Sequence, residues 1–355
     1  MIGTSLCVGD IPEPSLITDA IARALGKSHA RRQTDQIAAL LIFMSSHWAK
    51  HAGEVCQTAM RESRTLQIWG GVCKGIVVDG RIEHQRPAIG VAVIPERPER
   101  LHKARLSLTL GPHEPPITPT DPTASAANDE NETHALGLVS YGIHNDAFPT
   151  IQHGHLRTDD NSTLGIQAHR IQSFDSLGLE TLCDWQTVDK AIGPLLQKVA
   201  GTSACKALAC PTRNTQPVAL RVGVRRMERT DWIPVIEIHA DGALHLAETV
   251  NPGDTICLAA RTAECARREV AAWHDNLTPA FRSSTRRLIL LAGGMERSPL
   301  CHTDDPEWEV LRQQWPDTPM IGALGQAAWV HSPDLPRDRH TTALNHRLAA
   351  GFLLF

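Results

Sequence analysis

His153 and His155 are the closest pair of histidines in the chain, with only Gly154 between them. Residues two apart on a strand face the same side, so both rings could bind one metal ion, and the carboxylates of Asp159 and Asp160 follow closely. The alternative is a polar turn between two strands. Because a zinc site in a protein has a third, spaced ligand, the pair alone favours the turn, and we expect no metal there.

His47 and His51 are four residues apart, which on a helix places both on one face, beside the apolar side that Trp48 marks. They could bind metal or flank a haem, or they could be the exposed start of a helix. A haem held without covalent attachment needs one His or Cys in an apolar pocket, and the chain has 18 histidines. No Cys-x-x-Cys-His motif occurs, so only a b-type haem stays open as a hypothesis.

Two glycine pairs mark places where the backbone can approach a ligand closely. Trp69, Gly71 and Cys73 lie together in the segment IWGGVC, where the indole could stack on a ligand and the thiol could line a pocket. Both side chains could equally be buried core. Arg297 follows Gly293-Gly294 and could hold a carboxylate or phosphate through two parallel hydrogen bonds, or it could be a solvated surface arginine.

The signatures of several enzyme classes are absent from the sequence. It has no GxGxxG or P-loop motif for nucleotides and no GxSxG motif for a nucleophilic serine. Ser, His and Asp are plentiful, but a sequence does not show which of them converge. We therefore expect no catalytic residues, and a hydrolase-like enzyme stays as a third hypothesis.

Length and composition predict a cytoplasmic protein of two domains. The 355 residues, 42% of them hydrophobic, can bury a sizeable core, and the net charge of -4 with no dominant basic stripe excludes a nucleic-acid footprint. The nine cysteines are odd in number and irregularly spaced, which favours reduced thiols. The amino terminus does not resemble a signal peptide, and no apolar run reaches membrane-spanning length, so we expect no membrane association.

Apolar periodicity predicts the elements that must position these residues. Helices are expected at residues 14–26, 47–60, 187–200, 262–275 and 306–315, the third of them kinked by Gly193-Pro194. Strands are expected at residues 38–46, 65–71, 72–80, 88–94, 135–143, 164–174, 220–226, 232–244, 255–261, 286–294, 319–330 and 349–355. Asp79-Gly80 and Ala240-Asp241-Gly242 predict hairpin turns. Residues 112–134, without a hydrophobic period, predict a mobile surface loop inside the first domain, and residues 204–217 predict a loop between the domains.

The predicted fold class is α/β, with two related domains whose mixed, hairpin-containing sheets are packed by helices. Alternating strands and helices support this class, and the hairpin signals exclude a purely parallel sheet. The same order of elements also occurs twice in the chain. The first set is LLIFMSS, a helix, LQIWGGVCKG and AIGVAVI, and the second is LILLAGG, a helix, MIGALGQAAW and AGFLLF.

At these glycine-rich strands the sequence resembles the FIST (F-box and intracellular signal transduction) family. Its amino-terminal order of pieces matches LLIFMSS, IWGGVCKG and PAIGVAVI, and its carboxy-terminal order matches TPMIGALGQAAWVHS and RHTTALNHRLAAGFLLF. The resemblance covers roughly residues 38–355. Where relatives often have Cys-x-x-Arg, this chain has Gly294-Met295-Glu296-Arg297, and the acidic residue of the family's Gly-Glu element is replaced in the run after Gly322.

The resemblance implies a small-molecule-binding sensory module in intracellular signal transduction, without intrinsic catalysis, which passes its signal to a separate protein. Some relatives resemble haem-based nitric-oxide sensors that regulate histidine kinases, which is the haem hypothesis again. It also implies a FIST N-like domain at 37–217 and a FIST C-like domain at 218–355, and the helix expected at 14–26 makes residues 1–36 a helical extension before them. The residues expected to line the ligand pocket between the domains are Trp69, Gly71, Cys73, Arg297, Gly322 and Gln326.

Overall fold

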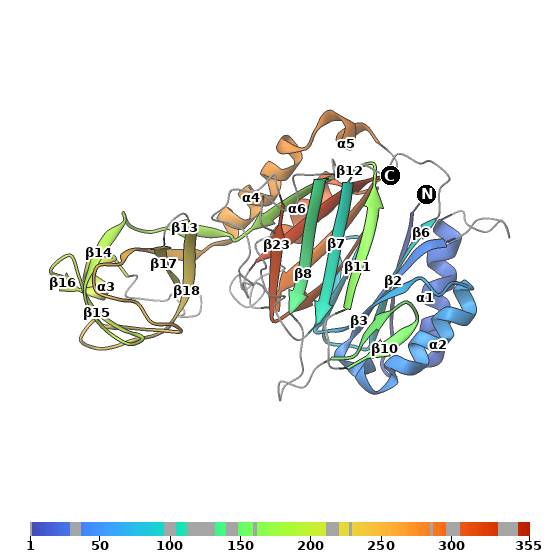
Figure 1. Cartoon of the computed structure of the whole chain (residues 1–355), viewed down its shortest axis with the longest axis horizontal. Helices are drawn as coiled ribbons and strands as arrows, with labels where there is room; N and C mark the ends of the chain where they lie inside the picture. Colours follow the sequence, from blue (N-terminus) through green and yellow to red (C-terminus); the bar gives the residue numbers. More distant parts are fainter. Residues whose placement is uncertain are drawn as a thin grey trace, which may run out of the picture.

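The chain folds as an α/β protein, as the sequence predicted, with an extended lobe at one side (Figure 1). This computed structural model describes residues 2–28, 37–95, 104–111, 132–139, 148–158, 162–210, 220–226, 229–284, 287–295, 306–332 and 347–355. Three sheets, A, B and C, form the body of the molecule, and a fourth forms the lobe. No helix within these described ranges is both long enough and apolar enough to cross a membrane.

Sheet A has six strands in the spatial order β1-β6-β2-β3-β9-β10. They are β1 (Gly3–Val8), β2 (Ile37–Ser45), β3 (Ile68–Cys73), β6 (Ala88–Pro95), β9 (Thr150–Gln152) and β10 (His155–Arg157). One face is covered by α1 (Pro14–Lys27), the 3-10 helix η1 (Ser46–His51) and α2 (Ala52–Ser63). Because successive residues of a strand face opposite sides, Leu40 and Ile42 of β2 pack against these helices while Leu41 and Phe43 face the centre of the body.

Sheet B also has six strands, in the order β12-β24-β21-β22-β4-β5. They are β4 (Gly75–Val78), β5 (Arg81–Glu83), β12 (Arg170–Ser176), β21 (Arg287–Gly294), β22 (Met320–Gly325) and β24 (Leu348–Leu354). Its outer face packs against α4 (Ala263–Asn276), α5 (Pro279–Ser283) and α6 (Pro306–Gln314). On β21, Ile289 and Leu291 face the helices, and Leu288 and Leu290 face the centre, as on β2.

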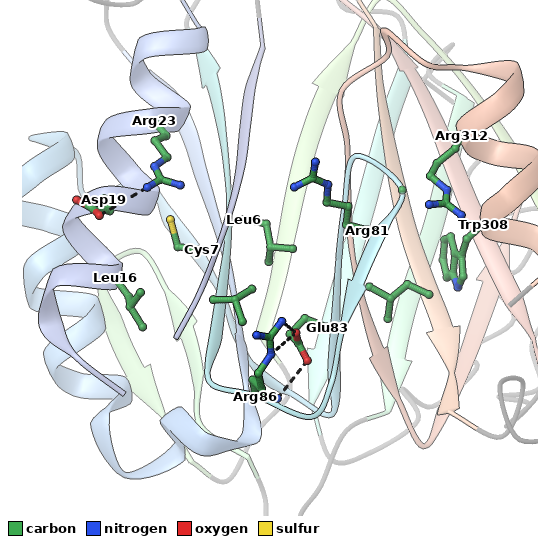
Figure 2. A pocket seen from close by; sticks show the side chains of 13 residues that line it. Leu6, Cys7, Leu16, Asp19, Arg23, Arg81, Glu83, Arg86, Trp308 and Arg312 are labelled. Carbon is green, nitrogen blue, oxygen red and sulfur yellow. Dashed lines mark hydrogen bonds and ion pairs between the residues drawn. The ribbon is translucent and has the colours of Figure 1, made fainter. Parts of the chain in front are cut away.

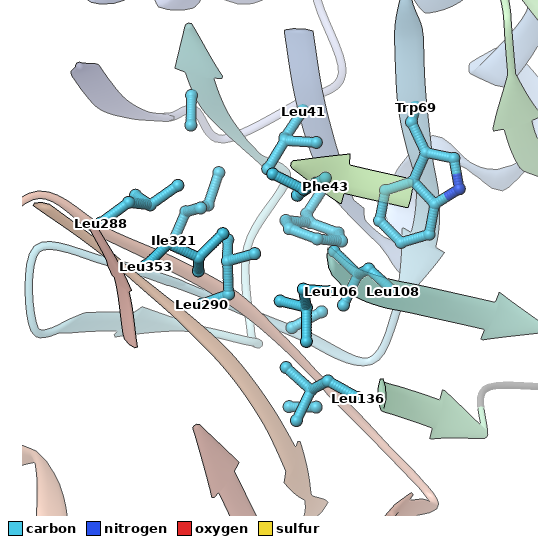
Figure 3. Close-up of a cluster of buried hydrophobic side chains, with 14 of the residues drawn as sticks. Leu41, Phe43, Trp69, Leu106, Leu108, Leu136, Leu288, Leu290, Ile321 and Leu353 are labelled. Carbon is cyan, nitrogen blue, oxygen red and sulfur yellow. The ribbon is translucent and has the colours of Figure 1, made fainter. Parts of the chain in front are cut away.

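Sheet C closes the body with four strands in the order β11-β7-β8-β23. They are β7 (Ala104–Gly111), β8 (Glu132–Val139), β11 (Ser162–Ala168) and β23 (Ala327–His331). Side chains from sheets A, B and C meet in one hydrophobic cluster, which contains Leu41, Leu106, Leu136 and Leu290 (Figure 3). The body therefore has a central core shared by three sheets and an outer helical layer on each of sheets A and B.

The lobe is an eight-stranded sheet in the order β13-β20-β14-β15-β19-β18-β17, with β16 paired to β15. Its elements are β13 (Leu179–Thr181), β14 (Gln186–Ile192), β15 (Leu195–Val199), β16 (Thr202–Ser203), α3 (Ala204–Ala207), β17 (Leu220–Arg226), β18 (Arg229–Ile238), β19 (Leu244–Leu246) and β20 (Thr255–Arg261). It has its own hydrophobic cluster, including Leu196, Val222 and Leu258. In the chain, the lobe lies between β12 of sheet B and α4.

Buried polar groups attach the lobe to the body where β13 begins. Glu269 of α4 accepts hydrogen bonds from the backbone N–H groups of Leu177 and Gly178, at 2.8 and 2.7 Å. Arg261, at the end of β20, donates to the carbonyl of Leu177 at 2.7 Å and to the carboxylate of Glu307 on α6 at 2.8 Å. The side chains of Arg261 and Glu307 are at most 1% exposed, so this ion pair lies inside the junction between lobe and body.

Most of the expected elements are present. The helices predicted at 14–26, 262–275 and 306–315 are α1, α4 and α6, and the turn at Asp79-Gly80 joins β4 to β5 with positive φ at both residues. The predicted helix at 187–200 is wrong: the segment forms the antiparallel strands β14 and β15, because Gly193-Pro194 makes a turn between Ile192 and Leu195 instead of a kink.

The sheets do not follow the predicted domain limits. Residues 1–36 were expected to be a helical extension, but β1 is a strand of sheet A paired along its length with β6. The boundary expected at 217/218 falls inside the lobe sheet, which contains strands from both sides of it. Sheets A and B nevertheless share a local order, since β2 pairs with β3 in parallel and β6 antiparallel, and β21 pairs with β22 and β24 in the same way.

In each parallel pair, one glycine lies directly against the neighbouring strand. Gly70 of β3 is in register with Ile42, and Gly322 of β22 is in register with Leu291. A Cβ atom added to Gly70 would overlap the carbonyl oxygen of Ile42, and one added to Gly322 would overlap that of Leu291. Neither position has space for any other residue, because backbone atoms cannot shift without breaking the strand pairing.

We expect Gly322→Ala to destabilise the protein by about 1–3 kcal/mol or more, because the added methyl group would force β21 and β22 apart. Gly53→Ala is the matched control, since an added Cβ there meets nothing within 4 Å and alanine favours the helix by about 1 kcal/mol. Urea unfolding followed by circular dichroism measures both. Equal stability of the two variants would contradict the close approach of β21 and β22.

Candidate functional site

The structure places Trp69 and Cys73 in the central core. Trp69 is 2% exposed and packs edge-on against Phe43, with ring centroids 6.0 Å apart. Cys73 is fully buried, its thiol donates to the carbonyl of Met44 at 3.3 Å, and burial raises the pKa of the thiol far above its ordinary value. Both residues therefore act as core side chains, the alternative that the sequence left open.

The glycines expected to line a pocket are also closely surrounded. A Cβ on Gly71 would lie 2.8 Å from the carbonyl oxygen of Pro149 and 2.9 Å from Leu110, and Gly322 lies against Leu291. The space beside each of them is therefore filled by the protein itself.

The remaining two predicted residues are Gln326 and Arg297. Gln326 is the half-buried residue between β22 and β23, where its backbone N–H donates to the carbonyl of Val139 at 2.9 Å. Arg297 lies outside the described residues, as do Asp159 and Asp160. The predicted set is thus not assembled into one pocket by the residues that the structure describes.

Three of the four histidines in the two pairs have a polar neighbour. His153 and Gly154 form the turn between β9 and β10, and Nδ1 of His153 lies 3.1 Å from Oε1 of Gln67. His47 lies 3.4 Å from Ser45, and His51 lies 3.6 Å from Glu54. In the part of the chain that the structure describes, neither pair belongs to a group of three metal-binding side chains.

A groove lies between sheet A with its helix α1 and sheet B with its helix α6 (Figure 2). It has a volume of about 590 Å³ and lies between β1 and α1 on one side and the β4–β5 hairpin and α6 on the other. Its apolar lining comes from Leu6, Val8, Leu16 and Ile82. A second hollow of about 780 Å³ shares Leu6, Arg23 and Arg81 with it, so the two form one continuous surface.

Five basic side chains line this continuous surface. They are Arg23 and Lys27 of α1, Arg81 of β5, Arg86 of the loop after β5, and Arg312 of α6. Three acidic residues lie among them, Asp19, Asp79 and Glu83. The excess is two positive charges. In Figure 2, Arg23 and Arg312 lie on opposite helices with Arg81 between them.

Three of these cations already have acidic neighbours. Arg23 lies 3.8 Å from Asp19, Lys27 lies 3.5 Å from Asp79, and Arg86 lies 2.9 Å from Glu83. Among the described residues, neither Arg81 nor Arg312 has an acidic side chain within 4.0 Å. These two guanidinium groups are therefore the ones available to an anion.

Asp79 connects the two walls of the groove. Its carboxylate accepts hydrogen bonds from the hydroxyl of Thr4 on β1, at 2.8 and 2.9 Å, and from the backbone N–H of Met320 on β22, at 3.2 Å. The backbone N–H of Asp79 donates to the carbonyl of Met320 at 2.9 Å. Because β1 and β22 belong to different sheets, Asp79 links sheet A to sheet B beside the groove.

Glu83 organises the loop at the base of the groove. One carboxylate oxygen accepts from the backbone N–H groups of His84, Gln85 and Arg86 at 2.9–3.1 Å, and the other accepts from the guanidinium of Arg86. Burial alone would raise the pKa of Glu83, but the bonds from Gln85 and Arg86 outweigh it and hold the pKa below its ordinary value. Glu83 therefore stays ionised and keeps Arg86 in place.

The groove offers little for covalent chemistry. Cys7 lines it, but burial raises the pKa of its thiol, against the opposing effect of Arg23, so the thiolate form is disfavoured. Ser5 donates its hydroxyl to the carbonyl of Ala20 at 2.5 Å. No histidine occurs among the lining residues that the structure describes, so a nucleophile with an adjacent imidazole base is not found there.

A comparison of the chain with models of known protein families finds no match, and a comparison with curated protein sequences finds none either. The function of the groove is therefore inferred from its own residues and their geometry.

This groove was not predicted from the sequence. Its basic residues come from α1, the β4–β5 hairpin, the loop after it and α6, and no local motif links them. The one sequence feature that could have indicated this groove is the predicted hairpin turn at Asp79-Gly80, because Arg81 follows it immediately.

We expect Glu83→Gln to lower the free energy of unfolding by about 1–3 kcal/mol near neutral pH, since the charged acceptor of several hydrogen bonds is lost. Because folding lowers the pKa of Glu83, its contribution is present above the ordinary carboxyl pKa and disappears as the pH falls through the folded-state value. The difference between wild type and variant should therefore shrink in acid. Denaturant unfolding over a pH series measures it.

Glu62→Gln is the matched control, because Glu62 lies at the surface beside Arg61 and organises no loop. It should change stability by a few tenths of a kcal/mol at most. A constant difference between Glu83→Gln and wild type at all pH values would show that Glu83 does not act through its charge.

Proposed function

We propose that this chain is a small-molecule-binding sensory module whose ligand is an anion, carrying a carboxylate or phosphate group, held in the groove between α1 and α6. The observation that carries the proposal is the pair Arg81 and Arg312, which line the groove without acidic partners among the described residues. A guanidinium binds a carboxylate or phosphate through two parallel hydrogen bonds, so each of these arginines can hold an anionic group.

The apolar part of the groove supports a small organic ligand over an inorganic ion. Leu6, Leu16 and Ile82 provide hydrophobic surface beside the arginines. Small-molecule sites commonly combine an apolar lining with a few polar groups that fix orientation. A ligand with an anionic group at one end and a hydrocarbon part at the other fits this combination.

The position of the groove supports a sensory role. Its walls come from elements of sheets A and B, so a ligand that contacts both Arg23 and Arg312 favours the arrangement in which the walls are close. Differential contact of this kind is what a ligand needs to shift a conformational equilibrium. We propose, with the resemblance to FIST proteins, that the module is cytoplasmic and passes this shift to a separate signalling protein.

Binding without turnover is the expected behaviour. The described lining of the groove contains no histidine, and its thiol has a raised pKa. These features favour a receptor over the hydrolase-like alternative.

We expect Arg81→Gln and Arg312→Gln each to weaken binding of anionic metabolites by about tenfold or more, since each removes a charge-assisted hydrogen-bonding group. The probes are a set of mono- and dicarboxylates and sugar phosphates, tested by thermal shift and then by calorimetry. The matched control is Arg157→Gln on the exposed strand β10, outside the groove, which should leave affinity unchanged.

Two results would overturn the proposal. One is an anion that binds with equal affinity to wild type and to the double variant Arg81→Gln/Arg312→Gln. The other is release of a product from a bound probe at a rate that the double variant abolishes, which would make the groove an active site.

A further inference from the structure

The β18–β19 hairpin of the lobe brings together three side chains of metal-ligand type. These are Glu237 and His239 on the outgoing arm and His245 on the returning strand. Their ligand atoms, a carboxylate oxygen and two imidazole nitrogens, all lie within 4.8 Å of one another. Within the described ranges, no other three or more His, Cys, Asp or Glu side chains converge in this way.

Strand geometry explains the convergence. Glu237 and His239 are two residues apart and so face the same side of the hairpin, and His245 is the residue paired with Glu237 across the strands. Directly paired residues have Cβ atoms only about 5 Å apart, which is close enough for one ion to contact both side chains. The two imidazole rings have centroids 6.3 Å apart and are inclined at 52°.

The turn between the arms is held by its own hydrogen bonds. The backbone N–H of His239 donates to the carbonyl of Ala243 at 2.9 Å, and that of Gly242 donates to the carbonyl of His239 at 2.9 Å. The carboxylate of Asp241 accepts from the N–H of Ala243 at 3.0 Å. His239 therefore has a fixed backbone position relative to the strand that carries His245.

The opposite face of the hairpin is anchored in the lobe core. Leu244 and Leu246, on either side of His245, are at most 1% exposed and belong to the hydrophobic cluster of the lobe. β19 is also flanked by β15, where Leu195 pairs with His245. The ligand face is thus presented to solvent by a strand that is paired on both edges, so little backbone ordering is needed when an ion binds.

We propose that Glu237, His239 and His245 form a binding site for a divalent transition-metal ion of the zinc type. Two imidazoles select zinc and its first-row neighbours over magnesium and calcium, which prefer oxygen ligands. Three protein ligands leave at least one coordination position for water or for a further ligand. The sequence signature is Glu-x-His-x₅-His across an Ala-Asp-Gly turn.

This site is independent of the anion groove. The groove is formed by α1, β1, the β4–β5 hairpin and α6 of the body, whereas the hairpin that carries the histidines belongs to the lobe sheet. Loss of anion binding and loss of metal binding can therefore be measured separately in the same full-length protein.

The test is titration of the full chain with Zn²⁺ in competition with a chromophoric chelator, under reducing conditions. Wild type should bind one equivalent of Zn²⁺. His239→Ala and His245→Ala should each weaken the affinity for this ion by at least about tenfold. Glu237→Gln, which keeps the shape of the side chain, should also weaken it. His155→Ala is the matched control, because His155 lies on an exposed hairpin strand of sheet A and should leave the site unchanged.

The cysteines are identical in all these variants, so binding by thiols contributes equally and cancels in the comparison. Unchanged stoichiometry and affinity in the double variant His239→Ala/His245→Ala would overturn the proposal. So would a preference for Mg²⁺ or Ca²⁺ over Zn²⁺ in the same competition.

A second measurement uses the unmodified protein. Zn²⁺ should protect His239 and His245, but not His155, from acylation by diethyl pyrocarbonate, as mapped by mass spectrometry. Equal modification of the three histidines with and without Zn²⁺ would contradict the proposed site, whatever the folding of the variants.

Discussion

The antiparallel pairing of β4 with β22 is the interaction on which the rest of the body depends. β3 ends at Cys73 in sheet A, and the chain then continues as β4 into sheet B, where Val77 is in register with Gly322. Two further backbone bonds extend the pairing, from Lys74 to the carbonyl of Leu324 and from Asp79 to that of Met320, both at 2.9 Å. This crossing places the β4–β5 hairpin beside α6. The groove lies next to both elements, and they contribute Arg81 and Arg312 to its lining.

The parts of the fold that could be predicted from the sequence are those whose burial is visible locally. β2 and β21 are packed on both faces, so their sequences are continuous apolar runs, and such runs are typical of buried strands. The helix predicted at 187–200 was wrong because the local burial pattern there does not distinguish a helix from a hairpin. Val188, Leu196 and Val199 are buried at spacings that also fit a helix, and only the pairing of Ile192 with Leu195 across Gly193-Pro194 distinguishes the hairpin.

The groove could not be predicted from the sequence because it depends on contacts between segments that are far apart in the chain. A glycine such as Gly322 indicates that other atoms lie close to its backbone. The sequence does not show whether those atoms belong to a ligand or to the protein, and in the structure they belong to the neighbouring strand β21. Arg81 and Arg312 are 231 positions apart and line one groove only because β4 pairs with β22. The Glu237, His239 and His245 group was closer to prediction, since the turn at Ala240-Asp241-Gly242 was recognised and strand alternation places all three on one face.

Helix α6 connects the proposed anion groove with the lobe. Arg312 lines the groove near one end of this nine-residue helix, and Glu307, near the other end, pairs with Arg261 at the base of the lobe. Removing either partner of a buried ion pair leaves an uncompensated charge, which strongly destabilises a protein, so the contact between α6 and the lobe is held firmly. Arg312 and Glu307 lie on the same short helix, so the groove and the junction with the lobe share one structural element. The lobe, which interrupts the chain between β12 and α4, is therefore joined to the body through the same helix that lines the groove.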